Sequence, residues 1–254
     1  LYGAWHGRDG TNKGWPELVT AAQDDAIADE MFRITRGTDM GWPYTYYDGV
    51  RNIRLTAPEY GGDGKTPVTD SKYATPVAAF APQRPAVLDL TFYNGTKFPS
   101  RYRGGAFLAM HGGGADGTVL PGGHGGYDIV FVPFSGNGRA GTPEVFADGF
   151  AGAGAGAKNV KTAAYRPVGV TAGPDGALYV ADSNKGKIWR IIVNAYDGVS
   201  NAVVLDKNLR QGCVMSPILF AIYIDGLARK IRESDIGRYW SEGWRPKVGS
   251  IALC

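Results

Sequence analysis

The chain contains three histidines, the residue type best suited to proton transfer near neutral pH. His6 and His111 each follow a short apolar run and stand where a strand is expected to end. A histidine in that position either touches a ligand in a channel or satisfies a structural hydrogen bond. His124 lies between two pairs of glycines, which is typical of a loop.

Acidic residues offer a second kind of chemistry, because carboxylates bind hard cations. A first group can brace a turn or form a solvated cluster, and it consists of Asp9, Asp29 and Glu30. A second group, in the glycine-rich loop 58–71, can bind a structural ion, and it consists of Glu59, Asp63 and Asp70. Asp182 ends an apolar run and either faces a channel or caps a turn. These alternatives stay open at the level of sequence.

Several classes of function are not indicated. No Ser/His/Asp order, phosphate loop or zinc spacing stands out, and the two cysteines, Cys213 and Cys254, make no metal motif. The net charge of +3 comes from scattered residues, so nucleic-acid binding is not expected. No apolar run reaches the roughly 18 residues of a membrane helix. The first residues carry no visible signal peptide.

Short β-rich runs separated by Gly, Pro, Asn or Asp fill residues 1–192, and 38 glycines support many tight turns. One four-stranded unit is expected at 87–93, 106–110, 127–134 and 144–150. Further strands are expected at 168–172, 178–180 and 188–192, and the middle strands of another unit at 1–5 and 31–35. The alanine–glycine run 151–157 is expected to be a flexible loop.

These repeats predict a mainly β fold, a partial β-propeller of the six-bladed type with about two and a half blades. A closed ring needs at least about four blades, so we expect an incomplete ring. After residue 192 the pattern changes, because Ser216-Pro217 opens a helix that runs to about residue 233. The predicted parts are therefore 1–192 and 193–254, the second with a short helical segment.

Several ordered motifs in residues 1–192 resemble the sorbosone and glucose dehydrogenase family of soluble quinoproteins. They include Gly41-Trp-Pro-Tyr-Thr-Tyr-Tyr-Asp48, Tyr102-Arg-Gly-Gly-Ala-Phe-Leu-Ala-Met-His-Gly112 and Arg166-Pro-Val-Gly-Val170. The resemblance implies a periplasmic or secreted propeller that holds pyrroloquinoline quinone (PQQ) and calcium at one end. A family histidine acts as general base while hydride passes from an aldose or related sugar to the quinone.

Carried over residue by residue, the resemblance assigns Arg166 to the position over the cofactor, and His111 to the same cofactor site. Gly7 and Arg8 match the turn whose backbone carbonyls hold calcium. The general-base histidine and an Arg-Asn pair of the family match no residue here, and a basic residue expected after Gly112 is replaced by glycine. We therefore expect no catalytic residue and no activity from this sequence, with a non-enzymatic fused β-domain of binding or structural role as the alternative.

Residues 209–220, with Tyr223 to Leu227 after them, resemble the palm of non-LTR retroelement reverse transcriptases. Polymerase chemistry needs metal-binding aspartates that this segment lacks, so it is not expected to polymerise. The open blade faces and the apolar stripe of the helix lead us to expect self-association.

Overall fold

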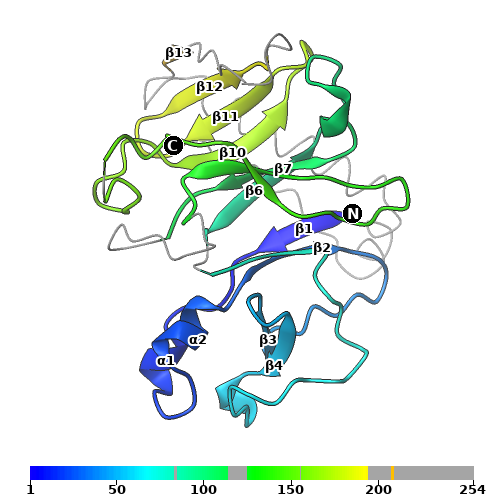
Figure 1. The fold of residues 1–254 in the computed structure, drawn as a ribbon, viewed down its shortest axis with the longest axis vertical. Helices are drawn as coiled ribbons and strands as arrows, with labels where there is room; N and C mark the ends of the chain where they lie inside the picture. Colours follow the sequence, from blue (N-terminus) through cyan, green and yellow to red (C-terminus); the bar gives the residue numbers. More distant parts are fainter. Residues whose placement is uncertain (83–84, 114–124, 155, 194–206, 209–254) are drawn as a thin grey trace, which may run out of the picture. The chain divides into compact units, whose positions relative to one another are not determined.

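The computed structural model describes residues 1–82, 85–113, 125–154, 156–193 and 207–208 (Figure 1). Leu1–Asn208 form one compact unit. The expected helix at 217–233 and the segment that resembles a reverse transcriptase lie outside the described residues. No helix in the described part is long and apolar enough to cross a membrane.

Three antiparallel sheets follow one another along the chain, here called the first, second and third blades. The first blade has the order β1 (Tyr2–Trp5), β2 (Asp29–Arg33) and β5 (Ala78–Phe80). The second runs through β6 (Val87–Phe92), β7 (Ala106–Met110), β8 (Asp128–Val132) and β9 (Glu144–Ala147). The third runs through β10 (Pro167–Ala172), β11 (Leu178–Asp182), β12 (Lys187–Ile191) and β13 (Lys207–Asn208).

The chain is mainly β, as its sequence predicts, and the second blade matches its expected four strands within a few residues. β7 and β8 are buried along their whole length because apolar residues cover both faces. In the first blade β2 is the middle strand, as expected, whereas β1 lies at the edge of the described sheet. The run around 151–157 contains no helix or strand among its described residues.

Two apolar clusters join the blades. One combines Met31 and Phe80 of the first blade with Leu108 and Val130 of the second. The other combines rings of the second blade, such as Phe107, with apolar residues of β10 and β11. Each sheet therefore buries a face against its neighbour, which is how propeller blades are stabilised.

A segment without predicted strands interrupts the first blade. It holds the short helices α1 (Thr11–Gly14) and α2 (Ala21–Asp25) and the hairpin of β3 (Thr45–Asp48) and β4 (Ile53–Thr56). Arg54 ties this hairpin to the blade through a buried ion pair with Glu30, at 2.9 Å. Burial raises the pKa of Glu30 although the arginine acts in the opposite direction. Short 3-10 turns occur at Pro58–Tyr60 and Ser100–Tyr102.

Two carboxylates, the buried Asp29 and the partly buried Asp89, connect consecutive blades through backbone N–H groups. Asp29 accepts from the N–H of Gly7 at 2.8 Å and from the N–H of Val87, in the next blade, at 3.0 Å. Asp89 in turn accepts from the N–H of Val170 in the third blade at 2.9 Å. Because β6 and β10 are edge strands, these bonds satisfy donors that no neighbouring strand can reach.

We predict that Asp29→Ala destabilises the protein. The change leaves two N–H groups inside the blade interface without this acceptor, each at a cost of about 1–3 kcal/mol. Urea unfolding followed by circular dichroism measures the loss. Asp70→Ala, at an exposed aspartate, is the matched control and is expected to change stability by less than about 0.5 kcal/mol. Equal stabilities of the two variants would contradict the bridging role of Asp29.

Candidate functional site

The antiparallel order of the strands brings the candidate residues to one end of the blades. The pairing registers put the end of β7 beside the start of β6, and the end of β11 beside the start of β10. The bonds from His6 to Val87 and from His111 to Ser183 bring the end of β1 and these two strand ends together. His6 follows β1, His111 follows β7 and Ser183 follows β11, so equivalent positions of three blades carry these side chains. We call His6, His111, Arg166, Asp182 and Ser183 the blade-end site.

His111 is the centre of this group. Its backbone N–H donates to the carbonyl of Ala86 at 2.9 Å, and its ring Nε2 forms a hydrogen bond with Ser183 Oγ at 2.9 Å. Burial lowers the pKa of His111 to about 4, and the nearby charges of Arg166 and His6 act in the same direction. The imidazole is therefore neutral at pH 7 and can accept a hydrogen bond or a proton.

His6 has its ring fixed by one bond. Its Nε2 lies 3.0 Å from the carbonyl oxygen of Val87, and since a carbonyl only accepts, Nε2 carries the hydrogen. In the neutral ring Nδ1 is then the acceptor. The side chain is exposed, so this nitrogen is available to a ligand or to water.

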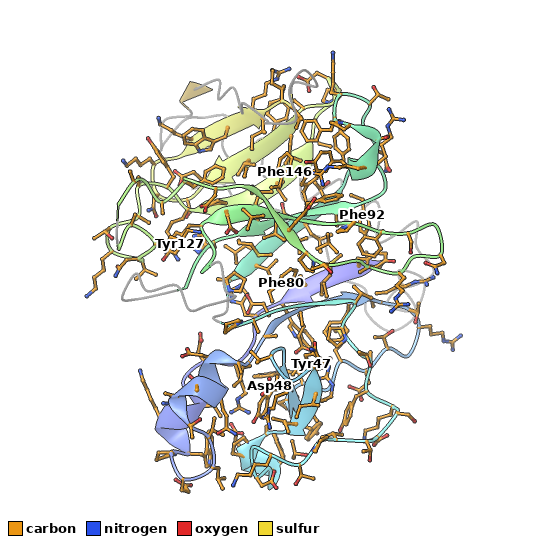
Figure 2. The ribbon with its side chains drawn as sticks, viewed as in Figure 1. Tyr47, Asp48, Phe80, Phe92, Tyr127 and Phe146 are labelled. Atoms are coloured by element: carbon orange, nitrogen blue, oxygen red, sulfur yellow. The ribbon has the colours of Figure 1, made fainter. Side chains whose placement is uncertain are left out.

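Arg166 reaches from the start of β10 back to the second blade. Its guanidinium donates to the carbonyls of His111, at 3.3 Å, and Gly112. The ring of Tyr127, labelled in Figure 2, lies 5.7 Å from the guanidinium carbon. None of the ion pairs among the described residues involves Arg166. Among the described residues its guanidinium contacts neutral groups, namely two backbone carbonyls and an aromatic ring.

Asp182 caps a turn, which is one of the two roles left open by the sequence. Its carboxylate accepts from the N–H of Arg166 at 2.6 Å and from those of Asn184 and Lys185 beyond β11. Asp182, which is buried, therefore fixes the backbone of Arg166.

Glycine is required after both histidines. A Cβ at Gly7 would lie 2.4 Å from the carbonyl oxygen of Ala28. Gly112 has a φ of +85°, and a Cβ there would lie 2.2 Å from the ring of Tyr127. The family match at Gly7 thus has a local steric reason.

The turn at Gly7 and Arg8, which the resemblance assigns to calcium, is held by contacts of its backbone and of the Arg8 side chain. Asp29 braces it by accepting from Gly7, so the alternative of a solvated acidic cluster is wrong for the buried Asp29 and Glu30. The side chain of Arg8 pairs with Glu59 and lies over the rings of Trp15 and Tyr46. The calcium role assigned to the backbone carbonyls stays a prediction.

The acidic residues of the loop 58–71 each have a different protein partner. Glu59 pairs with Arg8, Asp70 with Lys72 at 3.2 Å, and Asp63 accepts from Thr66. In the described part of the chain no three His, Cys, Asp or Glu residues come together as a metal site. His124 lies outside the described residues.

Sequence reasoning missed Ser183, Tyr127 and the neighbouring Asp128. A signal for Ser183 exists in the repeat of Ala-x-His-Gly at residues 4–7 and 109–112, which aligns with Ala-Asp-Ser-Asn at 181–184. Asp128 is fully buried, with Oδ2 at 3.6 Å from Lys158 Nζ. Burial raises its pKa to about 7 against the opposing effect of the lysine.

Residues 165–191 match the NHL repeat. This match covers β10, β11 and β12, and the repeat is consistent with the propeller blade seen there.

Solved structures of sugar dehydrogenases are similar at low identity. One described as glucose dehydrogenase has 18% identity and a TM-score of 0.47, over 76% of this chain and 40% of that one. The calcium structure of a Trichoderma reesei enzyme of carbohydrate-active family AA12 has 17% identity and a TM-score of 0.48, over 74% and 47%. The apo soluble aldose sugar dehydrogenase of Escherichia coli has 20% identity and a TM-score of 0.38, over 62% and 35%. The chain spans less than half the length of each. No curated protein matches it.

We predict that His111 and Asp128 give opposite pH dependences to stability. The folded protein keeps a proton on Asp128 between about pH 4 and 7, so this residue makes stability fall as pH rises, by at most about 1.4 kcal/mol per unit. The unfolded chain protonates His111 between about pH 4 and 6.5, so this residue makes stability rise with pH. The two effects offset each other in the parent protein.

Urea unfolding at a series of pH values separates the two effects. Asp128→Asn is expected to leave stability rising between pH 4 and 6.5, and His111→Gln to leave it falling between pH 4 and 7. The double variant serves as the control and should lack both slopes. Identical pH profiles for the two single variants would show that neither group is perturbed as described.

Proposed function

We propose that the blade-end site is part of the quinone site of a PQQ-dependent sugar dehydrogenase of the β-propeller type. The observation that carries this proposal is Arg166, whose guanidinium is held by two backbone carbonyls and an aromatic ring and meets no carboxylate among the described residues. PQQ carries several carboxylates, and a guanidinium is well suited to pair with them.

The chemistry of the other residues fits the same group. His111 is a neutral imidazole beside Arg166 and can exchange a hydrogen bond with a polar oxygen of a ligand. The backbone oxygens of Gly7 and Arg8 are hard ligands of the kind that calcium prefers. When bound, PQQ accepts the hydride of an aldose or related polyol, and the residues of this chain bind and orient it. We propose that the chain is located in the periplasm or outside the cell.

The general base of the resembling family matches none of the histidines of this sequence. We therefore propose that the 254-residue chain contributes cofactor contacts and does not oxidise sugar by itself. A positioned base contributes about 10²–10⁴-fold to rate, so its loss brings turnover below detection.

We predict weak binding of PQQ that depends on Arg166. With calcium present, calorimetry is expected to give a dissociation constant weaker than about 1 µM, because several charged contacts of the family are missing. Arg166→Met is expected to weaken binding by about 10- to 150-fold, the equivalent of one charge-assisted hydrogen bond.

Lys161→Met is the matched control, since it removes an exposed positive charge elsewhere. Equal affinities of Arg166→Met and the parent protein would contradict the proposal, as would absence of binding at millimolar PQQ. Dye-coupled oxidation of glucose at ordinary enzyme rates would contradict the statement that this chain lacks a base.

A further inference from the structure

Arg166 belongs to the third blade, but the described groups that its guanidinium contacts belong to the second. The contacts are the carbonyls of His111 and Gly112, just beyond β7, and the ring of Tyr127, just before β8. The two carbonyls fix the edge of the guanidinium, and the ring lies against it. Within the described part of the chain, these bonds use two of the five N–H groups of the guanidinium.

Tyr127 is held in an unusual way. Its φ of +61° lies in the left-handed region, where a bulky side chain costs about 1–2 kcal/mol. Its ring is fully buried and packs against small residues, namely Gly112, Ala151 and Ala163. Strain of this kind persists where the surrounding structure enforces it, and it is concentrated at functional sites.

The ring of Tyr127 and the turn at Gly112 are in close contact. Gly112 has no Cβ because the ring occupies that space, and the carbonyl of the same glycine binds the guanidinium. The Tyr127 ring thus packs against the same glycine whose carbonyl accepts from Arg166. A displacement of the ring is therefore expected to displace this hydrogen bond as well. Packing alone does not account for the contact between the Tyr127 ring and the Arg166 guanidinium.

We propose that Tyr127 is a positioning residue for Arg166. Its ring supports the guanidinium and keeps the remaining N–H groups turned toward an anionic ligand. The contact between a cation and a ring is attractive, and it removes freedom from a long side chain before a ligand binds. The ligand in question is the carboxylate-bearing quinone, so the functional part of this inference rests on the proposed function.

The test uses Tyr127→Phe, Tyr127→Leu and Arg166→Met in the full chain, with two separate measurements. The first is the exchange rate with water of the Arg166 Nε–H, observed by ¹⁵N NMR in the protein without ligand and assigned by its loss in Arg166→Met. The second is the affinity for PQQ in the presence of calcium. Tyr60→Leu is the control, because Tyr60 is a half-exposed tyrosine that contacts Tyr44.

Tyr127→Phe keeps the ring and is expected to match the parent protein within about twofold in both measurements. Tyr127→Leu should exchange the Nε–H several-fold faster and bind PQQ about 3- to 30-fold more weakly, the range expected for a lost cation–π contact. In the double variant Tyr127→Leu/Arg166→Met the leucine should cause no further loss of affinity.

An unchanged exchange rate in Tyr127→Leu would overturn the positioning role, whatever happens to PQQ. So would equal effects of Phe and Leu, since these would place the role in the hydroxyl group or in packing. If Leu fails to fold, Tyr127→Met is the second variant, with the same expectations. Faster exchange without any PQQ binding, even by the parent protein, would support the positioning and overturn the proposed function.

Discussion

The blades depend on backbone donors at the edges of β6 and β10. An N–H on an edge strand has no strand partner on its open side, and a buried donor must be satisfied. Here a carboxylate of the preceding blade reaches it: Asp29 reaches Val87, and Asp89 reaches Val170. Both bonds lie where these edge strands carry a bulge, since the register shifts between Val87 and Asp89 and between Pro167 and Gly169. Each blade thus specifies the position of the next.

At the blade-end site a side chain of the later blade bonds back to the earlier one. Arg166 extends from the third blade to carbonyls of the second, and the carboxylate of Asp182 holds the backbone from which Arg166 starts. The carboxylates accept hydrogen bonds from backbone N–H groups, and the guanidinium donates to backbone carbonyls. Donors and acceptors of the backbone are therefore both paired at these junctions. Because no carboxylate neutralises the guanidinium among the described residues, the junction that holds two blades together also leaves a positive charge available for binding.

The sequence predicted the parts that depend on local pattern. Alternation and tight turns placed the four strands of the second blade and the first three of the third within a few residues, but not β13. Ordered motifs selected His111 and Arg166, which do meet. It missed the hairpin of β3 and β4, because Tyr46 and Leu55 bury their side chains against a segment distant in sequence. It also missed the partners of Arg166, since Tyr127 and Ser183 reach the site only through the register between blades, which no local pattern contains.

The three blade ends show how one scaffold produces different chemistry. After β1 and β7 the chain continues with His-Gly, and each glycine allows a close approach that a Cβ would block. After β11 it continues with Ser183-Asn184, and the asparagine side chain donates to the carbonyl of Ala163 at 2.9 Å. The third blade therefore needs no glycine there, because its turn is closed by Asn184 and Asp182. The hydroxyl of Ser183 lies 2.9 Å from Nε2 of His111, so the side chain that follows the third blade's strand completes the contact at the centre of the site.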